Sequence, residues 1–235
     1  MNKASDSEKP ANKFVQMLRP SRTIPITPWR ADSTWSIGSG SKHFQRIFIL
    51  IFGLFIFGIG DSLLIITGLG NAPWSVLAQG ISLNTPLSIG EATFFISLTV
   101  LALWIPLRQK PGLGTLANII VIAAAIEIGL AFIPEVNNLA LKYFYIFFGI
   151  ALVGVGSALY ITCGLGTGPR DGLMTGLHYR TGIRVGRVRL GIELIALIIG
   201  ALLGGTVGIG TALFALLIGQ SVAISLGVVD RLTSK

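Results

Sequence analysis

The sequence predicts an all-α integral membrane protein with six transmembrane helices, arranged as two inverted three-helix repeats. Three observations predict this fold. Hydrophobic residues make up 52% of the chain and charged residues only 12%, whereas a soluble domain carries about a quarter charged residues. Apolar runs of about twenty residues, the length that crosses a bilayer, recur along the chain. The sequence also matches itself at a fixed offset. Helices are expected because open strands would leave backbone groups unpaired in lipid.

The six predicted spans fall into two sets of three. Their approximate bounds are Ile47–Ile66, Ile89–Leu107 and Leu113–Ile133, then Leu141–Thr162, Val188–Leu203 and Ile209–Val229. The chain is accordingly divided into a basic, disordered cytoplasmic tail (residues 1–45), a first membrane repeat (46–133), a second membrane repeat (139–229) and a cytoplasmic C-terminus (230–235). The tail has no apolar h-region, which argues against a cleaved signal peptide.

The two sets of spans align without a gap at an offset of 96 residues, from Gly68 to Gly164. Gly68-Leu69-Gly70 aligns with Gly164-Leu165-Gly166, and Pro73 aligns with Pro169. Because each unit has an odd number of spans, the two copies must enter the membrane from opposite sides. This is the inverted-repeat plan of many secondary transporters.

The basic residues predict the orientation of the chain. With the N-terminus in the cytoplasm, all of the 18 Lys and Arg residues except Lys142 face inward, as the positive-inside rule requires. The net charge of +8 then reflects topology and attraction to anionic lipid at the cytoplasmic face. We expect no nucleic-acid partner, and both termini are placed in the cytoplasm.

The loop after the first span of each unit is the best candidate for a binding site. It reads Gly-Leu-Gly-Asn-Ala-Pro-Trp from Gly68 and Gly-Leu-Gly-Thr-Gly-Pro-Arg-Asp from Gly164. The glycines end the span, Asn71 or Thr167 is expected to cap the next helix, and the proline suits a first helical turn. That helix, of about ten residues, is too short to cross the bilayer. It is therefore interfacial or re-entrant.

A re-entrant helix would turn its free amides and positive dipole end toward an anionic ligand. Arg170 would add a charge-assisted fork at the same place. The substrate-binding hypothesis therefore includes Gly166, Thr167, Gly168, Arg170, Asp171, Gly70 and Asn71. The alternative is that the glycines only permit a tight turn and close helix packing.

Acidic residues inside the predicted spans are the second candidate. A carboxylate in lipid costs at least about 2.5 kcal/mol, so each must be protonated, paired or facing a polar cavity. Asp61 and Glu127 have no acidic counterpart in the other repeat and are candidate coupling acids for a proton or a cation. The alternative for Glu127 is a buried structural hydrogen bond. Glu193 is expected to pair with Arg189, one turn away.

Other functional classes lack the residues that they need. Two histidines, the single Cys163 and no clustered acids give no ligand set for a catalytic metal. The sequence lacks the nucleophile–base pair that would indicate an enzyme. Neither loop has the Gly-Lys-Ser/Thr ending of a P-loop. We therefore expect no enzymatic activity, no metal and no cofactor.

Four stretches carry a resemblance: Gly68–Trp74, Trp104–Thr115, Gly164–Leu177 and Gly204–Thr211. They resemble the bacterial YczE family, which belongs with the broader YitT/YczE group of membrane proteins. The resemblance covers about residues 44–229 and implies a polytopic protein of the bacterial inner membrane, with no assigned biochemical activity. Ser75 departs from the pattern, which would place an aspartate there to match Asp171.

These features favour a transporter-like permease for a small solute or ion, which would bind between the two Gly-Pro loops. The alternative is a non-transporting accessory or scaffold protein that acts through its basic tail and the arginine-rich segment 170–189. A homo-oligomer is left open.

Overall fold

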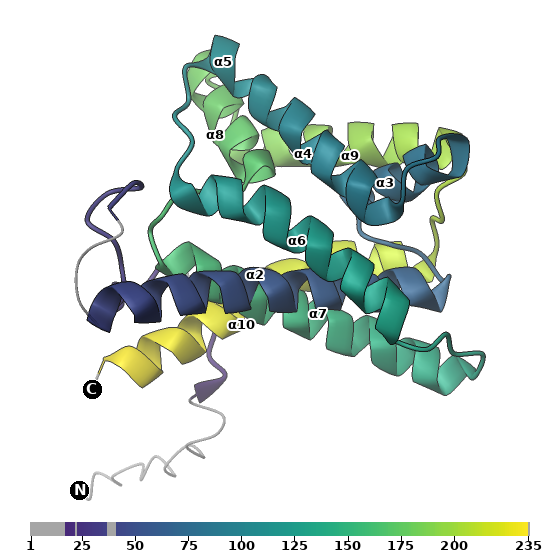
Figure 1. The fold of residues 1–235 in the computed structure, drawn as a ribbon, viewed down its shortest axis with the longest axis horizontal. Helices are drawn as coiled ribbons and strands as arrows, with labels where there is room; N and C mark the ends of the chain where they lie inside the picture. The colour runs from purple at the N-terminus through teal and green to yellow at the C-terminus, as the bar shows by residue number, and fades with distance from the viewer. Residues whose placement is uncertain (1–16, 22, 37–40, 235) are drawn as a thin grey trace, which may run out of the picture.

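The computed structural model describes residues 17–21, 23–36 and 41–234, and within them the regular structure is helical (Figure 1). The helices are α2 (Ser41–Thr67), α3 (Pro73–Asn84), α4 (Ile89–Ala102), α5 (Trp104–Leu107), α6 (Leu113–Phe132), α7 (Leu139–Thr162), α8 (Pro169–Thr181), α9 (Val185–Leu202) and α10 (Ile209–Thr233).

Among the described residues, five helical segments are long and apolar enough to cross a membrane. They are α2 from Lys42, α4 together with α5, α6, α7 and α10. Five of the six predicted spans therefore have a matching helix of this kind. The remaining one forms α9, but its 18 residues include Arg187, Arg189 and Glu193, and these charges exclude it from the five.

The helices form two groups. In the first, α2 packs most extensively on α7 and α6, and α7 also packs on α10. In the second, α3 packs on α9 and α4, while α8 contacts α4 and α9. Figure 1 shows α2, α7 and α10 running across the lower part of the view, with the second group above them. Helix α4 also packs against α6 and so joins the two groups.

Glycines allow α2 and α7 to approach closely. A Cβ atom on Gly60 would lie 2.7 Å from the carbonyl oxygen of Gly149, and one on Gly53 would lie 3.0 Å from that of Gly156. Small residues at such crossings let membrane helices pack backbone to backbone. The α2–α7 contact is therefore the central seam of the first group.

The two Gly-Leu-Gly loops have nearly the same backbone conformation. The φ angles are +63° at Gly68 and +117° at Gly70, and +67° at Gly164 and +117° at Gly166. Left-handed values of this kind favour glycine, because a Cβ atom would be strained there. The loops end where Pro73 begins α3 and Pro169 begins α8, as the sequence predicted.

The predicted helix caps are wrong. The N-cap residues of α3 and α8 are Ala72 and Gly168, and neither helix has a side-chain cap. Asn71 instead turns inward, where its Nδ2 donates to Gln79 Oε1 at 2.7 Å. Thr167 lies one residue before the N-cap of α8, so neither side chain caps the helix that follows it.

Residues 23–36 lie against the helix bundle. Thr27 Oγ1 donates to the carbonyl oxygen of Thr162 at 3.1 Å, and Trp29 Nε1 donates to Thr162 Oγ1 at 3.2 Å. The Nε of Arg46 donates to the carbonyl oxygen of Trp29 at 2.6 Å. These contacts hold the segment over the end of α7. The structure thus differs here from the expected disordered tail, because the segment finds partners in the bundle.

The rest of the expected tail is described only in part. Arg231 donates to the carbonyl oxygens of Met17 and Arg19 at 2.5 and 2.6 Å, which ties residues 17–21 to the end of α10. Residues 1–16, 22 and 37–40 lie outside the described residues, as does residue 235 of the predicted C-terminus.

Candidate functional site

A cavity of about 190 Å³ lies at the start of α3 and α8. All the described helices except α5 contribute to its lining, so it occupies the centre of the fold. Its charged lining residues are Asp61, Arg170, Asp171, Arg189 and Glu193. Aromatic and aliphatic side chains complete the wall, among them Phe57, Trp74 and Ile218.

The two short helices begin beside each other at this cavity. Trp74 is the second residue of α3 and Arg170 is the second residue of α8. The guanidinium carbon of Arg170 lies 4.9 Å from the centre of the Trp74 ring, within the range of a cation–π contact. The aromatic ring therefore supports the guanidinium from one side.

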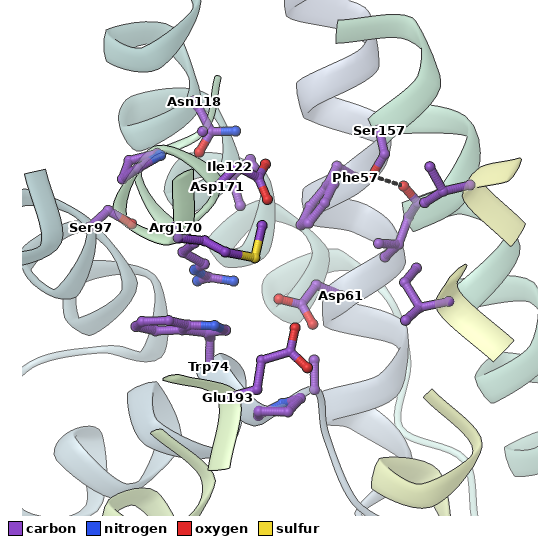
Figure 2. A pocket seen from close by; sticks show the side chains of 18 of the residues that line it. Phe57, Asp61, Trp74, Ser97, Asn118, Ile122, Ser157, Arg170, Asp171 and Glu193 are labelled. Atoms are coloured by element: carbon purple, nitrogen blue, oxygen red, sulfur yellow. Dashed lines mark hydrogen bonds between the residues drawn. The ribbon is translucent and has the colours of Figure 1, made fainter. Parts of the chain in front are cut away.

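Arg170 has no ion pair within 4.0 Å and no hydrogen bond to another described residue. Asp61, Asp171 and Glu193 are near enough to act on it electrostatically. Figure 2 shows Arg170, Asp61 and Glu193 turned toward the same space, with Trp74 beneath the guanidinium. The cation thus faces the cavity with carboxylates around it but none bonded to it.

Asp61 and Asp171 are held by hydroxyl groups. Ser75 Oγ donates to Asp61 Oδ2 at 2.7 Å, and Tyr160 Oη donates to Asp171 Oδ2 at 2.9 Å. Asp61 is only 3% exposed, and its Oδ1 has no hydrogen-bond partner. A buried carboxylate oxygen without a donor is costly, so Asp61 is only half satisfied within the protein.

Arg189 and Glu193 form the predicted pair on α9. Arg189 Nε lies 2.9 Å from Glu193 Oε1, and both side chains are partly exposed. This confirms the predicted contact one turn apart. Both residues also line the cavity, which the sequence did not indicate.

Of the seven residues in the substrate-binding hypothesis, three line the cavity: Gly168, Arg170 and Asp171. Gly70 and Gly166 pack instead against the starts of α10 and α6. A Cβ atom on Gly70 would lie 2.6 Å from the amide nitrogen of Gly208, and one on Gly166 would lie 2.8 Å from Thr115 Oγ1. For these two glycines the structure supports the alternative of close packing.

Thr167 and Asn71 also lie outside the cavity lining. The backbone oxygen of Thr167 accepts from Thr115 Oγ1 at 2.7 Å, which fixes the loop to the start of α6. Asn71 is fully buried, and its amide nitrogen bonds to Gln79, which also accepts from the amide of Thr206 at 2.8 Å. Both residues therefore hold the loops in place.

The two candidate coupling acids are separated in the structure. Asp61 lines the cavity, and Glu127 does not. Glu127 Oε1 accepts a hydrogen bond from the amide of Gly90 at 2.5 Å, at the start of α4. The side chain thereby ties α4 to α6, which matches the structural hydrogen bond considered as the alternative.

Trp74, Tyr160 and Ser157 are among the cavity residues that were not predicted as site residues. Trp74 and Ser157 had a signal in the sequence, because they stand at the repeat positions of Arg170 and Asp61. Tyr160 had none, since a tyrosine near a helix end is ordinary in membrane proteins. Within the described residues, no group of three His, Cys, Asp or Glu side chains is placed to hold a metal ion.

Comparisons with known proteins identify the family. A family of unknown function, DUF6198, matches residues 44–226. An uncharacterized protein of Haemophilus influenzae is 44% identical over 216 residues, which cover 92% of this chain and 97% of the relative. The uncharacterized membrane protein YczE of Bacillus subtilis is 32% identical over 158 residues, 66% of this chain and 74% of the relative.

A third relative, the uncharacterized protein YyaS of Bacillus subtilis, is 27% identical over 183 residues, 76% of this chain and 91% of the relative. No solved structure matches the chain significantly. With its helices long enough to span a bilayer, the chain is a multi-pass membrane protein related to YczE, and it belongs to the DUF6198 family.

Proposed function

We propose that this protein is a permease for a small solute or ion, which binds in the central cavity. Arg170 carries the proposal, because its guanidinium faces an interior cavity without a bonded polar partner among the described residues. An unpaired charge inside a protein is costly. In membrane proteins, ionisable groups in such positions typically mark the path of a substrate or an ion.

The halves of the protein are, in this proposal, inverted repeats. Residues that are equivalent at the 96-residue offset make reciprocal contacts. The amide of Gly114 donates to the carbonyl oxygen of Leu165 at 2.7 Å, and the amide of Gly210 donates to that of Leu69 at 2.9 Å. Each loop therefore packs on the third span of the other half, which supports a twofold relation between them.

The contact between Trp74 and Arg170 supports the same relation. These residues are equivalent to each other, and equivalent residues meet only near the axis that relates two copies. Because both line the cavity, the proposed substrate site lies at the pseudo-twofold axis. Transporters with inverted repeats commonly bind their substrates there, at the ends of broken helices.

The acids at the cavity follow an exchanged pattern. In the first half, the long helix carries the carboxylate of Asp61 and the short helix carries the hydroxyl of Ser75. In the second half, the long helix carries Ser157 and the short helix carries Asp171. At these two equivalent positions each half thus supplies one carboxylate and one hydroxyl to the lining or its immediate support, which favours a single site built by both repeats.

The halves also differ in a way that suits alternating access. Helix α4 packs on α6, whereas α9 and α10, the equivalent pair, do not pack extensively. The cavity lining includes Ile192 and Glu193 on α9 and Phe214 and Ile218 on α10. If the two halves exchanged these packing arrangements, α9 would close on α10 and α4 would separate from α6, as alternating access requires.

The orientation is also proposed, with the N-terminus in the cytoplasm of a bacterial cell. The excess of Lys and Arg in the segments then placed inside supports it. Lys142, at the start of α7, is the exception. The basic segments would contact anionic lipid at the inner face.

Reconstitution tests the permease. Purified protein in liposomes would be assayed for uptake of amino acids, carboxylates, alkylamines and inorganic ions. We expect uptake of at least one class and its loss by tenfold or more in Arg170→Gln. Arg184→Gln is the matched control, because Arg184 is exposed and outside the cavity lining. Equal flux in Arg170→Gln and the wild type would contradict the site, and no flux of any solute would contradict the permease.

The alternative is a scaffold that acts through the basic tail. Removing residues 1–40 would not separate the two functions, since it would also remove Thr27 and Trp29, which contact α7. Deleting residues 1–16 leaves those contacts in place. A permease should keep its flux in this variant, whereas a scaffold that depends on its basic tail should lose its partner.

A further inference from the structure

We propose that the cavity binds a small zwitterion of the amino-acid type, with its carboxylate on Arg170 and its ammonium group on Asp61. The inference rests on the proposed function and names the substrate class of the same site. It starts from two opposite charges that face one cavity, neither of which is fully satisfied within the described residues.

The carboxylate end of the ligand is assigned to Arg170. A guanidinium presents a planar fork that matches a carboxylate with two parallel hydrogen bonds. Trp74 covers one face of the group at 4.9 Å and leaves its edges without a bonded partner among the described residues. The start of α8, whose N-cap Gly168 has no side-chain cap, adds a positive dipole end beside it.

The ammonium end is assigned to Asp61. This side chain is 3% exposed, lines the cavity, and has one oxygen without a donor. An ammonium group carries three donors and no acceptor, so it would supply what Oδ1 lacks. The Glu193 carboxylate also lines the cavity, but Arg189 already pairs with one of its oxygens.

The gap between the two charges is what makes room for a ligand. Arg170 and Asp61 act on each other electrostatically, yet no nitrogen and oxygen of theirs approach within 4.0 Å. The cavity of about 190 Å³ far exceeds the roughly 15 Å³ that one water molecule needs and has room for a molecule the size of alanine.

The charge balance favours a zwitterion over a simple ion. The lining carries three carboxylates, on Asp61, Asp171 and Glu193, against two guanidiniums, on Arg170 and Arg189. A lone anion would add to the excess of negative charge, and a lone cation would leave Arg170 unpaired. A zwitterion satisfies both groups and leaves the net charge of the cavity unchanged.

Binding to the purified full-length protein tests the inference. The probes are alanine, propionate, which lacks the amino group, and ethylamine, which lacks the carboxyl group. Glycine and serine extend the zwitterion set. Millimolar alanine, glycine or serine should raise the unfolding temperature and change the tryptophan fluorescence, since Trp74 lies in the site. Propionate and ethylamine should bind at least tenfold more weakly.

Two variants locate the ends of the ligand. Arg170→Lys keeps the charge but loses the fork, and Asp61→Asn keeps the shape but loses the charge. Each should weaken zwitterion binding tenfold or more, while Arg184→Gln should bind as the wild type does. Size-exclusion chromatography identifies a variant that has not folded, and the ligand comparison on the wild type is decisive by itself.

The outcomes separate this inference from the proposed function. If propionate binds as well as alanine and Asp61→Asn has no effect, the site holds an anion and the zwitterion assignment is wrong. If no zwitterion binds, it is wrong as well, even where liposomes take up another solute. Tight binding of alanine without flux would instead support the site and contradict the permease.

Discussion

At the scale of single residues, some polar groups at the cavity are held by a hydrogen bond within the protein. Others have no such bond and are available to a ligand. Tyr160 donates to Asp171, and Ser75 donates to one oxygen of Asp61. The other oxygen of Asp61 and the guanidinium of Arg170 have no such partner among the described residues. Since buried polar groups are normally satisfied, the available pair is where a ligand is expected. The hydrogen bonds from Tyr160 to Asp171 and from Ser75 to Asp61 fix the geometry around that ligand site.

The first prediction concerns the residues that are held. Tyr160→Phe removes the hydroxyl donor and leaves Asp171 without its bond from α7. Hydrogen bonds between membrane helices contribute between about 0.6 and 2 kcal/mol, so thermal unfolding in detergent should show a loss of that order. Tyr179→Phe is the control, because Tyr179 is 76% exposed. An unchanged unfolding temperature for Tyr160→Phe would contradict a supporting role.

The second prediction concerns Cys163, the single cysteine of the chain. It lies directly after α7 and is fully buried, and burial raises the pKa of its thiol to about 12. The reactive thiolate should therefore be almost absent near neutral pH. Maleimide should not label the folded protein, should label it after denaturation in SDS, and should label an exposed Asn137→Cys variant readily.

The same pKa gives a sign for the dependence of stability on pH. Because the folded thiol holds its proton more tightly than the unfolded one, its contribution to stability is present below the ordinary thiol pKa. It is lost as the pH rises toward 12. Rapid labelling of the folded protein near neutral pH would show that the Cys163 environment is not closed.

At the scale of elements, single contacts fix how the helices begin. Trp104 Nε1 donates to the carbonyl oxygen of Pro169 at 2.9 Å, and the indole covers Gly172, where a Cβ atom would collide with it. Ser88 and Glu91 form a capping box at the start of α4. These contacts aim the short helix α8 at the cavity and hold α4 beside it.

The third prediction concerns the tie between α4 and α6. Glu127→Ala removes the acceptor for the Gly90 amide and should cost about 1–2 kcal/mol, while Glu127→Gln keeps an acceptor and should cost less. Thermal unfolding measures both, and Glu135→Ala, at an exposed loop position, is the control. Ligand binding in the cavity should change little in Glu127→Gln. A complete loss of transport with intact stability would instead restore Glu127 as a coupling acid.

At the scale of the whole molecule, the sequence predicted the helices better than the contacts between them. The spans and the prolines at Pro73 and Pro169 were predictable because hydrophobic length and proline geometry act locally. Contacts such as Trp74 with Arg170, or Glu127 with Gly90, depend on how two distant segments pack. The folded segment 23–36 was missed for the same reason, since its partners lie at the end of α7.

The proposed inverted repeat also predicts a second state of the molecule. In the described state Glu127 contacts Gly90, whereas the equivalent Ala223 carries no acceptor side chain and a Cβ atom on Gly186 would meet nothing within 4 Å. The amide of Ser21 instead bonds to the carbonyl oxygen of Ala223 at 2.8 Å. Ser21 therefore lies against α10 at the position where, in the first half, α6 is in contact with α4.

The fourth prediction tests that second state. If α9 closes on α10 during transport, a Gly186→Cys and Ala223→Cys pair should come within disulfide distance and should cross-link under oxidation. Cross-linking should stop flux in liposomes, and reduction should restore it. The buried Cys163 keeps the background low, and Gly186→Cys alone is the control. Deleting residues 1–21 removes the bond to Ala223 and should speed the reaction. If neither form of the double variant cross-links, the exchange between the halves does not occur at this pair.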